Sequence, residues 1–339
     1  MSRVQIFNNA GFKLIEVDAD ADRSWMIGQY ARCVFTIPVI SDKCREQFLR
    51  YGNLVLIEHE KLPAWGGVID LPRTWGNNKV EITAYSAEYL LNFRHTGYRD
   101  KKITAGAMFK ECIDIANRVS DTRLIKAGPI DEGGELVKFE LRNQNMYEFV
   151  KDKISKAGYE WRITPVLENN RLSFEATLYL KHEIFTDMVL AEGYNIQAGD
   201  SVLTEDGDIY NQYLGFGAGS SWSSRYKYTV SDLDSQSKYG YRETAYEVNE
   251  SNKANVEKYT REKLAETKEP ELKFDLSALD KGDTWKYLNL GAIMRVELSV
   301  CGFNGDKLGT EADVRIIGMS LAENKGAVRL ICEKHDDAE

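Results

Sequence analysis

The 339-residue sequence predicts a β-dominated α+β protein, and three observations support this class. Apolar and polar residues alternate with period two near both ends of the chain, as in half-buried strands. Between the ends, segments with helical spacing are mixed with strand-like segments. Tyrosine is frequent, with 18 Tyr against 13 Phe and 6 Trp, which favours sheet faces and protein–protein surfaces, although ordinary β-rich domains also explain such an excess.

The order β, α+β, β predicts three domains, because a chain of this length is too long for one ordinary core. Their expected bounds are 1–100, 101–185 and 186–339. In the first domain the pattern predicts a short amphipathic helix at 41–51 and strands at 11–18, 24–38 (a pair) and 53–58. Pro38 has no backbone N–H to donate and is expected to end the second strand of the pair.

Residues 65–93 predict a long hairpin followed by a short helix. A strand at 65–70 contains the glycine pair Gly66–Gly67, residues 71–78 form a turn-rich connection, and a second strand spans 79–85. Asn77 and Asn78 tolerate the left-handed backbone that a tight turn needs. Ser86 is expected to cap the helix. A helix across the end of a hairpin is typical of a small closed β-barrel.

The second domain is predicted to contain two helices and three strands. The first helix spans 104–120, and the second begins at its cap Asn143 and ends at Gly158, which tolerates positive φ. Strands are expected at 136–141, 159–165 and 171–180, the last two joined by a turn at Asn169–Asn170.

The third domain is predicted to be mainly β. Residues 232–243 indicate a polar loop, and 250–268 indicate a highly charged helix anchored by Val256, Tyr259 and Leu264, with its other faces solvated or against another subunit. Strands are expected at 194–196, 208–214, 220–228, 271–276, 293–300, 312–321 and 327–333, with a turn at Gly326.

Charge and composition exclude several classes of protein. The net charge is −9 with a pI near 5.3, which argues against binding of phosphate backbones. The five cysteines are scattered without C-x-x-C spacing, which indicates reduced thiols and synthesis in a cytoplasm. We expect no signal peptide and no membrane span, because the N-terminus lacks a cleavable apolar segment and no run of about 18 apolar residues occurs.

No motif predicts a catalytic, cofactor-binding or metal site. The four histidines, His59, His95, His182 and His335, lie outside metal patterns, and Glu58–His59–Glu60 lacks the second histidine of H-E-x-x-H. There is no G-x-S-x-G elbow and no Walker A sequence. The glycine-rich segment 215–219 precedes a strand-like segment, whereas a dinucleotide-binding loop is followed by a helix. The acidic turn at residues 206–208 has too few carboxylates for a calcium-binding loop.

Several segments, taken together and in order, resemble bacteriophage tail-hub proteins, the baseplate-hub-like tail proteins of siphophages and prophages. In the N-terminal part the matching residues are 24–25, 35–38, 65–69, 80–86 and 90–91. Later in the chain they are 193–196, 208–211, 232–242, the charged helix at 250–268, 290–296 and 315–331. Each motif is loose alone, so the resemblance depends on their collinear order over nearly the whole chain.

The resemblance implies two tail-tube-like β-barrel domains, near the two ends of the chain, with an intervening α+β domain. It implies a homotrimer in which the barrels form a pseudo-sixfold ring that joins the hexameric tail tube to tip structures and lets DNA pass. Implied partners are the tail tube or distal tail protein ring, the tape measure protein, and fibre, receptor-binding or tip proteins. The implied location is the virion tail tip, after assembly in the host cytoplasm.

An acidic lumen would repel DNA over about 8–10 Å at physiological salt, so we expect a net negative lumen and no sequence-specific nucleic-acid binding. Family members often carry a C-terminal lytic or receptor-binding module, which is not expected within these residues. The alternatives are a tail-associated cell-wall hydrolase, either a peptidase or a glycosidase, and a receptor-binding module.

Overall fold

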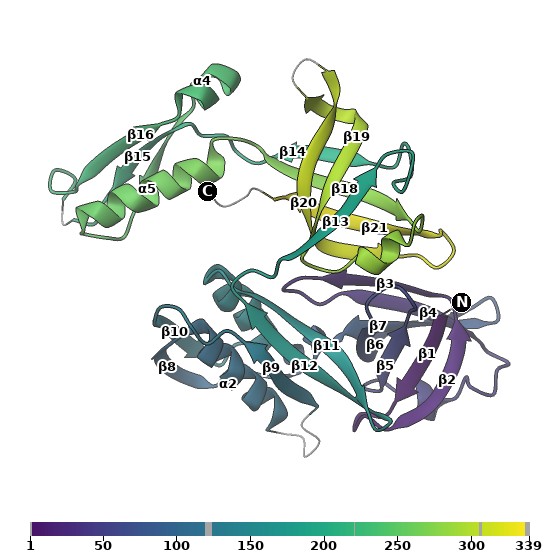
Figure 1. The fold of residues 1–339 in the computed structure, drawn as a ribbon. Coiled ribbons are helices and arrows are strands. Elements are labelled where there is room, and N and C mark those ends of the chain that lie inside the picture. Colours follow the sequence, from purple (N-terminus) through teal and green to yellow (C-terminus); the bar gives the residue numbers. More distant parts are fainter. Residues whose placement is uncertain (1, 119–123, 220, 305–306, 336–339) are drawn as a thin grey trace. The chain divides into compact units, whose positions relative to one another are not determined.

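The computed structural model describes residues 2–118, 124–219, 221–304 and 307–335. About 50% of the chain is strand and 19% helix, so the predicted β-dominated α+β class is confirmed. The chain divides into two compact units, one of residues 1–201 with 275–339 and the other of residues 202–274 (Figure 1). The three predicted domains, 1–100, 101–185 and 186–339, remain a prediction.

The N-terminal β half contains seven strands and two short helices. Its strands are hydrogen-bonded in the order β3-β4-β7-β6-β5-β1-β2. The bounds are β1 (Ser2–Phe7), β2 (Lys13–Ala19), β3 (Ala21–Met26), β4 (Arg32–Pro38), α1 (Glu46–Leu49), β5 (Leu54–Glu58), β6 (Trp65–Gly76), β7 (Lys79–Ser86) and the 3-10 helix η1 (Ala87–Phe93). The predicted strand end at Pro38 is confirmed, whereas β1 was not predicted.

The connection predicted at 71–78 is wrong, because β6 continues through it as far as Gly76. A shift in register between Asp70 and Arg73 absorbs the irregular sequence and lets the ladder with β7 resume. The turn itself consists of Asn77 and Asn78, with φ of 50° and 59°, as predicted. Ser86 precedes η1, but its side chain does not cap the helix by hydrogen-bonding to its backbone.

A central segment packs its helices onto the same core as the N-terminal β half. Buried Phe7, Leu56 and Val68 belong to one apolar cluster with Phe109 and Trp161. The bounds are β8 (Tyr98–Ile103), α2 (Ala105–Asn117), β9 (Ile125–Ile130), β10 (Val137–Arg142), α3 (Met146–Phe149), the π-helix η2 (Val150–Ile154), β11 (Glu160–Glu168) and β12 (Arg171–Tyr179).

Two helices in this segment begin with a side-chain cap, and one of these caps differs from the prediction. Thr104 caps α2 by accepting a hydrogen bond from the Ala107 N–H; the last predicted residues of this helix, 119–120, lie outside the described residues. The predicted cap Asn143 is wrong. Asn143 has φ of 52°, and Asn145 instead accepts from the Glu148 N–H. Three residues, 143–145, therefore separate β10 from α3.

The C-terminal β half repeats the strand order of the N-terminal half. Its strands are β13 (Ile184–Ala191), β18 (Glu271–Leu279), β19 (Ala292–Asn304), β20 (Lys307–Leu321) and β21 (Ala327–Lys334), with the 3-10 helix η3 (Thr284–Tyr287). The order β18-β21-β20-β19-β13 matches β4-β7-β6-β5-β1, with a short helix after the first strand in both. One pair differs in direction, because β13 is parallel to β19 whereas β1 is antiparallel to β5.

The predicted strand at 194–196 is wrong, because Tyr194 and Asn195 lie in a turn after β13 and Ile196 forms isolated bridges with Glu192 and Ala278. Asn195 holds this turn through its side chain, which accepts from the Ala191 N–H and donates to the Val189 carbonyl. Local side-chain bonds of this kind compete with a sheet ladder. The predicted strands at 293–300, 312–321 and 327–333 are confirmed, and each is longer in the structure.

The second compact unit is a small sheet with one long helix packed on it. Its elements are β14 (Val202–Asp206), β15 (Gln212–Phe216), β16 (Lys227–Ser231), α4 (Leu233–Tyr239), β17 (Glu243–Glu247) and α5 (Lys253–Thr267). The three-stranded sheet has the order β16-β15-β17, and β14 pairs with β18. Strand β15 starts at Gln212, so only the end of the predicted strand 208–214 is confirmed.

Three predictions in this unit need correction. Residues 232–243 are not a loop: Asp232 caps α4 by accepting from the Ser235 N–H, and β17 follows. In α5 the buried anchors are Val256, Thr260 and Leu264, whereas Tyr259 is 37% exposed. Thr260 is buried because Gly215 of β15 has no side chain to exclude it. Within the predicted strand 220–228, residues 221–224 form a turn and β16 begins at Lys227; residue 220 lies outside the described part.

Candidate functional site: a polar junction between the β halves

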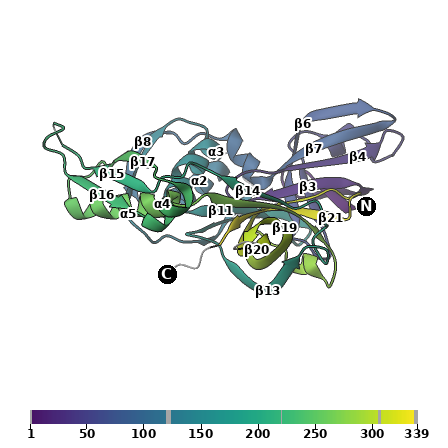
Figure 2. The same ribbon diagram turned by 90° about the horizontal axis from the view of Figure 1, so that it is seen from above.

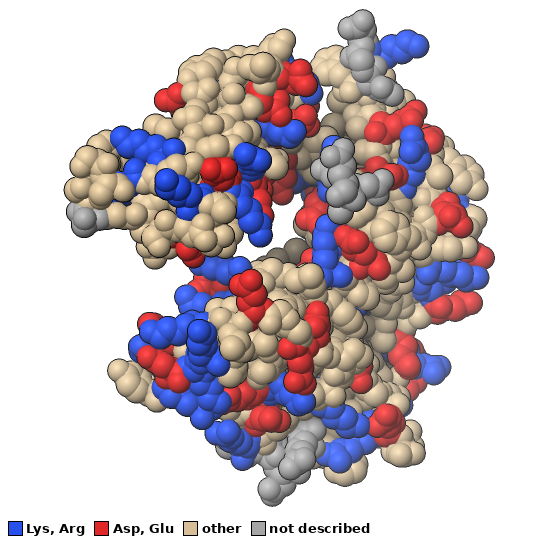
Figure 3. Space-filling view, turned by 60° about the vertical axis from the view of Figure 1, so that its left-hand side comes forward, with Lys and Arg blue, Asp and Glu red and all other residues tan. Residues whose placement is uncertain are grey.

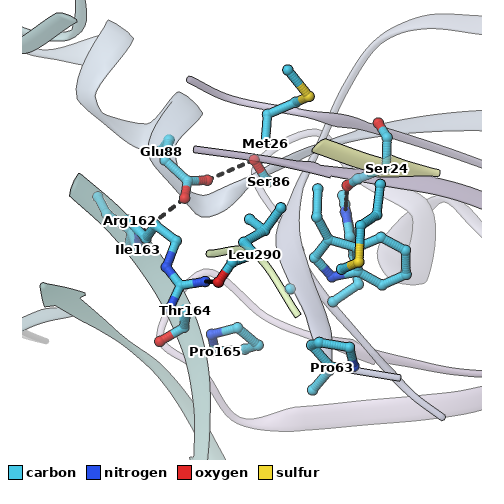
Figure 4. Close-up of a pocket in the computed structure, with 15 residues that line it drawn as sticks. Ser24, Met26, Pro63, Ser86, Glu88, Arg162, Ile163, Thr164, Pro165 and Leu290 are labelled. Atoms are coloured by element: carbon cyan, nitrogen blue, oxygen red, sulfur yellow. Dashed lines mark hydrogen bonds between the residues drawn. The ribbon is translucent and has the colours of Figure 1, made fainter. Parts of the chain in front are cut away.

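The two β halves are joined directly, because residues 23–26 of β3 pair antiparallel with residues 318–321 of β20. Beside this pairing lies a cavity of about 60 Å³ lined by Met26, Trp65, Pro165, Leu290 and Met319, among others (Figure 4). Ligand pockets usually measure roughly 300–1,000 Å³. The cavity is therefore a packing gap at the junction rather than a ligand site of ordinary size.

The buried carboxylate of Glu88 connects three elements at one side of the cavity. Its oxygens accept hydrogen bonds from the Ser86 hydroxyl at 2.6 Å and from the Ile163 N–H of β11 at 2.9 Å. The Ser86 hydroxyl in turn accepts from the Ala31 N–H. Burial raises the pKa of Glu88, and these bonds offset part of the increase.

Arg162 extends the junction toward the C-terminal half. Its guanidinium donates to the Leu290 carbonyl at 3.4 Å (Figure 4). Burial lowers the pKa of Arg162, while the nearby negative charges of Glu88 and Glu160 raise it. The side chain thus brings a positive charge from β11 to the segment that precedes β19.

Arg315 of β20 is almost fully enclosed in the junction, with a side chain 1% exposed. It donates to the carboxylates of Glu160, at the start of β11, and Glu333 of β21, the latter at 2.9 Å. It also donates twice to the His182 carbonyl, at 2.9 and 3.1 Å. The His182 N–H donates to Glu160 at 3.0 Å. One guanidinium therefore joins the central segment, β20 and β21.

A second buried arginine, Arg23, secures the pairing of β3 with β20. It donates to Glu323, in the turn after β20, and to the Ser2 hydroxyl, each at 3.0 Å. Burial acts to raise the pKa of Glu323, but the bonds from Ser2 and Arg23 outweigh it and leave the pKa lowered. Glu323 is therefore held ionised beside Arg23.

The histidines take structural roles where the structure describes their contacts. His59 accepts from the N–H groups of Lys61 and Leu62 in a turn, the His182 ring lies 4.6 Å from that of Tyr179, and buried His335 contacts Phe185. His95 forms an isolated bridge with Asn145. Within the described ranges no cluster of three His, Cys, Asp or Glu side chains could hold a metal ion.

The cysteines are unpaired, and three are buried. Burial raises the pKa of the Cys112 thiol to about 12 and that of Cys33 and Cys332 further, so these thiols stay protonated.

After Phe216, the glycine loop is followed by a turn and β16, without the helix of a dinucleotide site among residues 221–231. Asp206 is paired with Lys273 at 2.9 Å. That the chain lacks catalytic, cofactor and metal residues remains a prediction.

The exposed surface mixes charge of both signs with a few large apolar side chains. On the face shown in Figure 3, acidic and basic groups are interspersed. Leu71 and Trp75 of β6 are 60% and 59% exposed, and Phe303 and Leu308 are also exposed near the tip of the β19–β20 hairpin. No described helix has the length and apolar character to cross a membrane.

Sequence reasoning did not identify the junction. Arg315 stands in the apolar run Val314–Ile317, and this was the available signal, because a charge in a buried strand needs a partner. Its partners Glu160 and His182 are more than 130 residues away in the sequence.

The fold is shared with phage tail proteins over almost the full length of the chain. Prophage tail protein gp18 of Listeria monocytogenes EGD-e has a TM-score of 0.59 at 15% identity, covering 99% of this chain and 95% of that one. The prophage MuSo2 43 kDa tail protein of Shewanella oneidensis has a TM-score of 0.61 at 11% identity and 98% coverage of both chains. The tail protein of Neisseria meningitidis MC58 has a TM-score of 0.61 at 13% identity, with 99% and 97% coverage.

A chain of the Francisella PdpA–VgrG complex also matches, with a TM-score of 0.61 at 9% identity, covering 99% of this chain and 53% of that one. No family model and no curated protein matches the sequence. The protein therefore has the fold of phage tail proteins, and the resemblance inferred from the sequence is confirmed at the level of the fold.

Proposed function

We propose that this protein is a structural hub at the distal end of a phage tail. Three copies form a ring in which N-terminal and C-terminal β halves alternate as six similar units. The ring joins the hexameric tail tube on one side to tip or fibre proteins on the other, and DNA passes through its centre. The protein catalyses no reaction and needs no cofactor.

The observation that carries this proposal is the repeated strand order of the two β halves. A sixfold tube can continue onto a threefold ring only if each subunit presents two similar faces. The order β4-β7-β6-β5-β1 and its counterpart β18-β21-β20-β19-β13 supply such a pair. The likeness to prophage tail proteins over at least 95% of both chains supports the same role.

The partners follow from this position in the tail. They are the tail tube or distal tail protein ring, the tape measure protein, and tip, fibre or receptor-binding proteins, all met in the virion after assembly in the host cytoplasm. A net charge of −9 suits a DNA channel, because acidic walls do not retain phosphate groups.

Native mass spectrometry and light scattering of the full chain test the proposal. We expect a species of three times 38.6 kDa, with a ring in negative-stain images. A zymogram on bacterial cell walls tests the alternative of a tail-associated hydrolase, and lysis by the purified protein would contradict the structural role.

A further inference from the structure

The joint between the two β halves is the pairing of β3 with the end of β20. β19 pairs with β20 only as far as Arg315, and on the same side β3 pairs with residues 318–321 of β20. The joint thus consists of an edge strand of one half placed on the uncovered end of a long strand in the other half. Its apolar residues Met319 and Leu321 are buried.

The repeated strand order assigns a counterpart to each strand of this joint. The hydrogen-bonded orders β3-β4-β7-β6-β5-β1 and β14-β18-β21-β20-β19-β13 correspond strand by strand. β14 is therefore the counterpart of β3, and β6 is the counterpart of β20. A second joint of the same kind would place β14 on β6.

β6 has the uncovered end that this second joint needs. β5 pairs with β6 only from Trp65 to Val68, whereas β7 pairs with it as far as Gly76. Residues 71–76 therefore have an edge that no described strand covers, and Figure 2 shows β6 outermost in the projecting hairpin. Pro72 lies at the start of this edge and contributes no N–H donor to it. Trp75 is exposed here, whereas Met319 and Leu321, at the covered end of β20, are buried.

β14 has the matching free edge. β14 is the last strand of the hydrogen-bonded order, and among the described strands it pairs only with β18. Its side chains include exposed Val202 and the acidic Glu205, whereas the β6–β7 hairpin carries Lys79 beside its turn. An apolar contact and opposite charges thus favour pairing of these two edges, and long exposed edges are otherwise prone to uncontrolled association.

We infer that β14 of one copy pairs with residues 71–76 of β6 in the next copy. This inference rests on the proposed trimer and names the surfaces that close it. The contact is heterologous, because each copy contributes β14 to one neighbour and β6 to the other, and such contacts form a ring when the rotation closes. The β3–β20 joint within each copy and the β14–β6 contact between neighbouring copies would then alternate around the six β halves of the ring.

Proline substitutions on the two edges test the inference with the full chain. Thr204→Pro and Glu205→Pro address β14, and Thr74→Pro and Trp75→Pro address β6. Adjacent residues in a strand point their N–H groups to opposite edges of the strand. In each pair of variants, one proline therefore removes an N–H from the free edge, whereas the other removes an N–H that bonds to the neighbouring strand of the same copy. The second variant should be the less stable to heat, so thermal unfolding identifies the first, which is the variant used in the assembly experiment. Thr229→Pro or Val230→Pro, chosen in the same way on β16, is the control.

We expect the wild type and the control to form trimers and each edge variant to remain monomeric. The dissociation constant of the contact between copies should rise about tenfold or more, because one hydrogen bond between the strands is lost and its acceptor is left unsatisfied. The deciding sample is an equimolar mixture of the two edge variants. Each retains the edge that the other lacks, so the mixture should form a 1:1 dimer that cannot close, measured by native mass spectrometry.

Folded edge variants that still form trimers, or a mixture that stays monomeric while the wild type is trimeric, would overturn the inference and leave the hub proposal standing. A wild-type chain that stays monomeric up to its solubility limit would overturn both.

Discussion

Replacing Arg315 with alanine should destabilise the protein far more than removing an exposed arginine from the neighbouring strand. Arg315 is 1% exposed and donates to two carboxylates and a backbone carbonyl. Breaking a buried ion pair typically costs about 3–5 kcal/mol, because the remaining charges lose their partner. Glu160 and Glu333 are partly exposed and can be rehydrated, so we expect about 3 kcal/mol, at the lower end of that range.

The assay is thermal unfolding of wild type and variant followed by circular dichroism. A change of 1 kcal/mol shifts the midpoint by about 2–4 °C in a domain of 150–250 residues, so Arg315→Ala should lower it by about 6–12 °C. Arg329→Ala on β21 is the matched control. Arg329 also pairs with a carboxylate, that of Asp275, but is 65% exposed, so we expect about 0.2–1 kcal/mol. Equal shifts for the two variants would refute the role assigned to the junction.

Three further predictions follow from packing, protonation and charge. Gly66→Ala would place its Cβ 2.4 Å from the Cβ of Pro165 and should cost about 1–3 kcal/mol in urea unfolding, whereas Gly76→Ala on the same strand meets no atom within 4 Å and should change stability by less than about 0.5 kcal/mol. Burial raises the pKa of Glu88 above its ordinary 4.5, so the wild type loses stability as the pH rises from 4.5 through the pKa of the folded state. The unfolding free energy of Glu88→Gln should therefore increase relative to that of the wild type over the same pH range. A difference that stays constant with pH would contradict the assignment. Because the net charge is −9, the anisotropy of labelled duplex DNA should not change on addition of the protein at physiological salt, and tight binding would argue against a DNA channel.

The fold class and most strands and helices were predictable from the sequence, because they depend on local patterns. The Asn77–Asn78 turn, the helix after Thr104 and the strand end at Pro38 each follow from the conformational preference of a few residues. Local patterns were misleading where a side chain bonded to nearby backbone, as Asn195 does in a turn that alternation predicted to be a strand.

Which strands are neighbours and which charges are buried together became known only from the folded chain. Period-two alternation predicts that β3 and β20 each bury one face, but it contains no information on their pairing across nearly 300 residues. In the same way the burial of Arg315 depends on Glu160 and His182, which chain folding brings to it from distant segments. The physical reason is that a residue's own preferences set its local conformation, whereas its partners depend on how the whole chain packs.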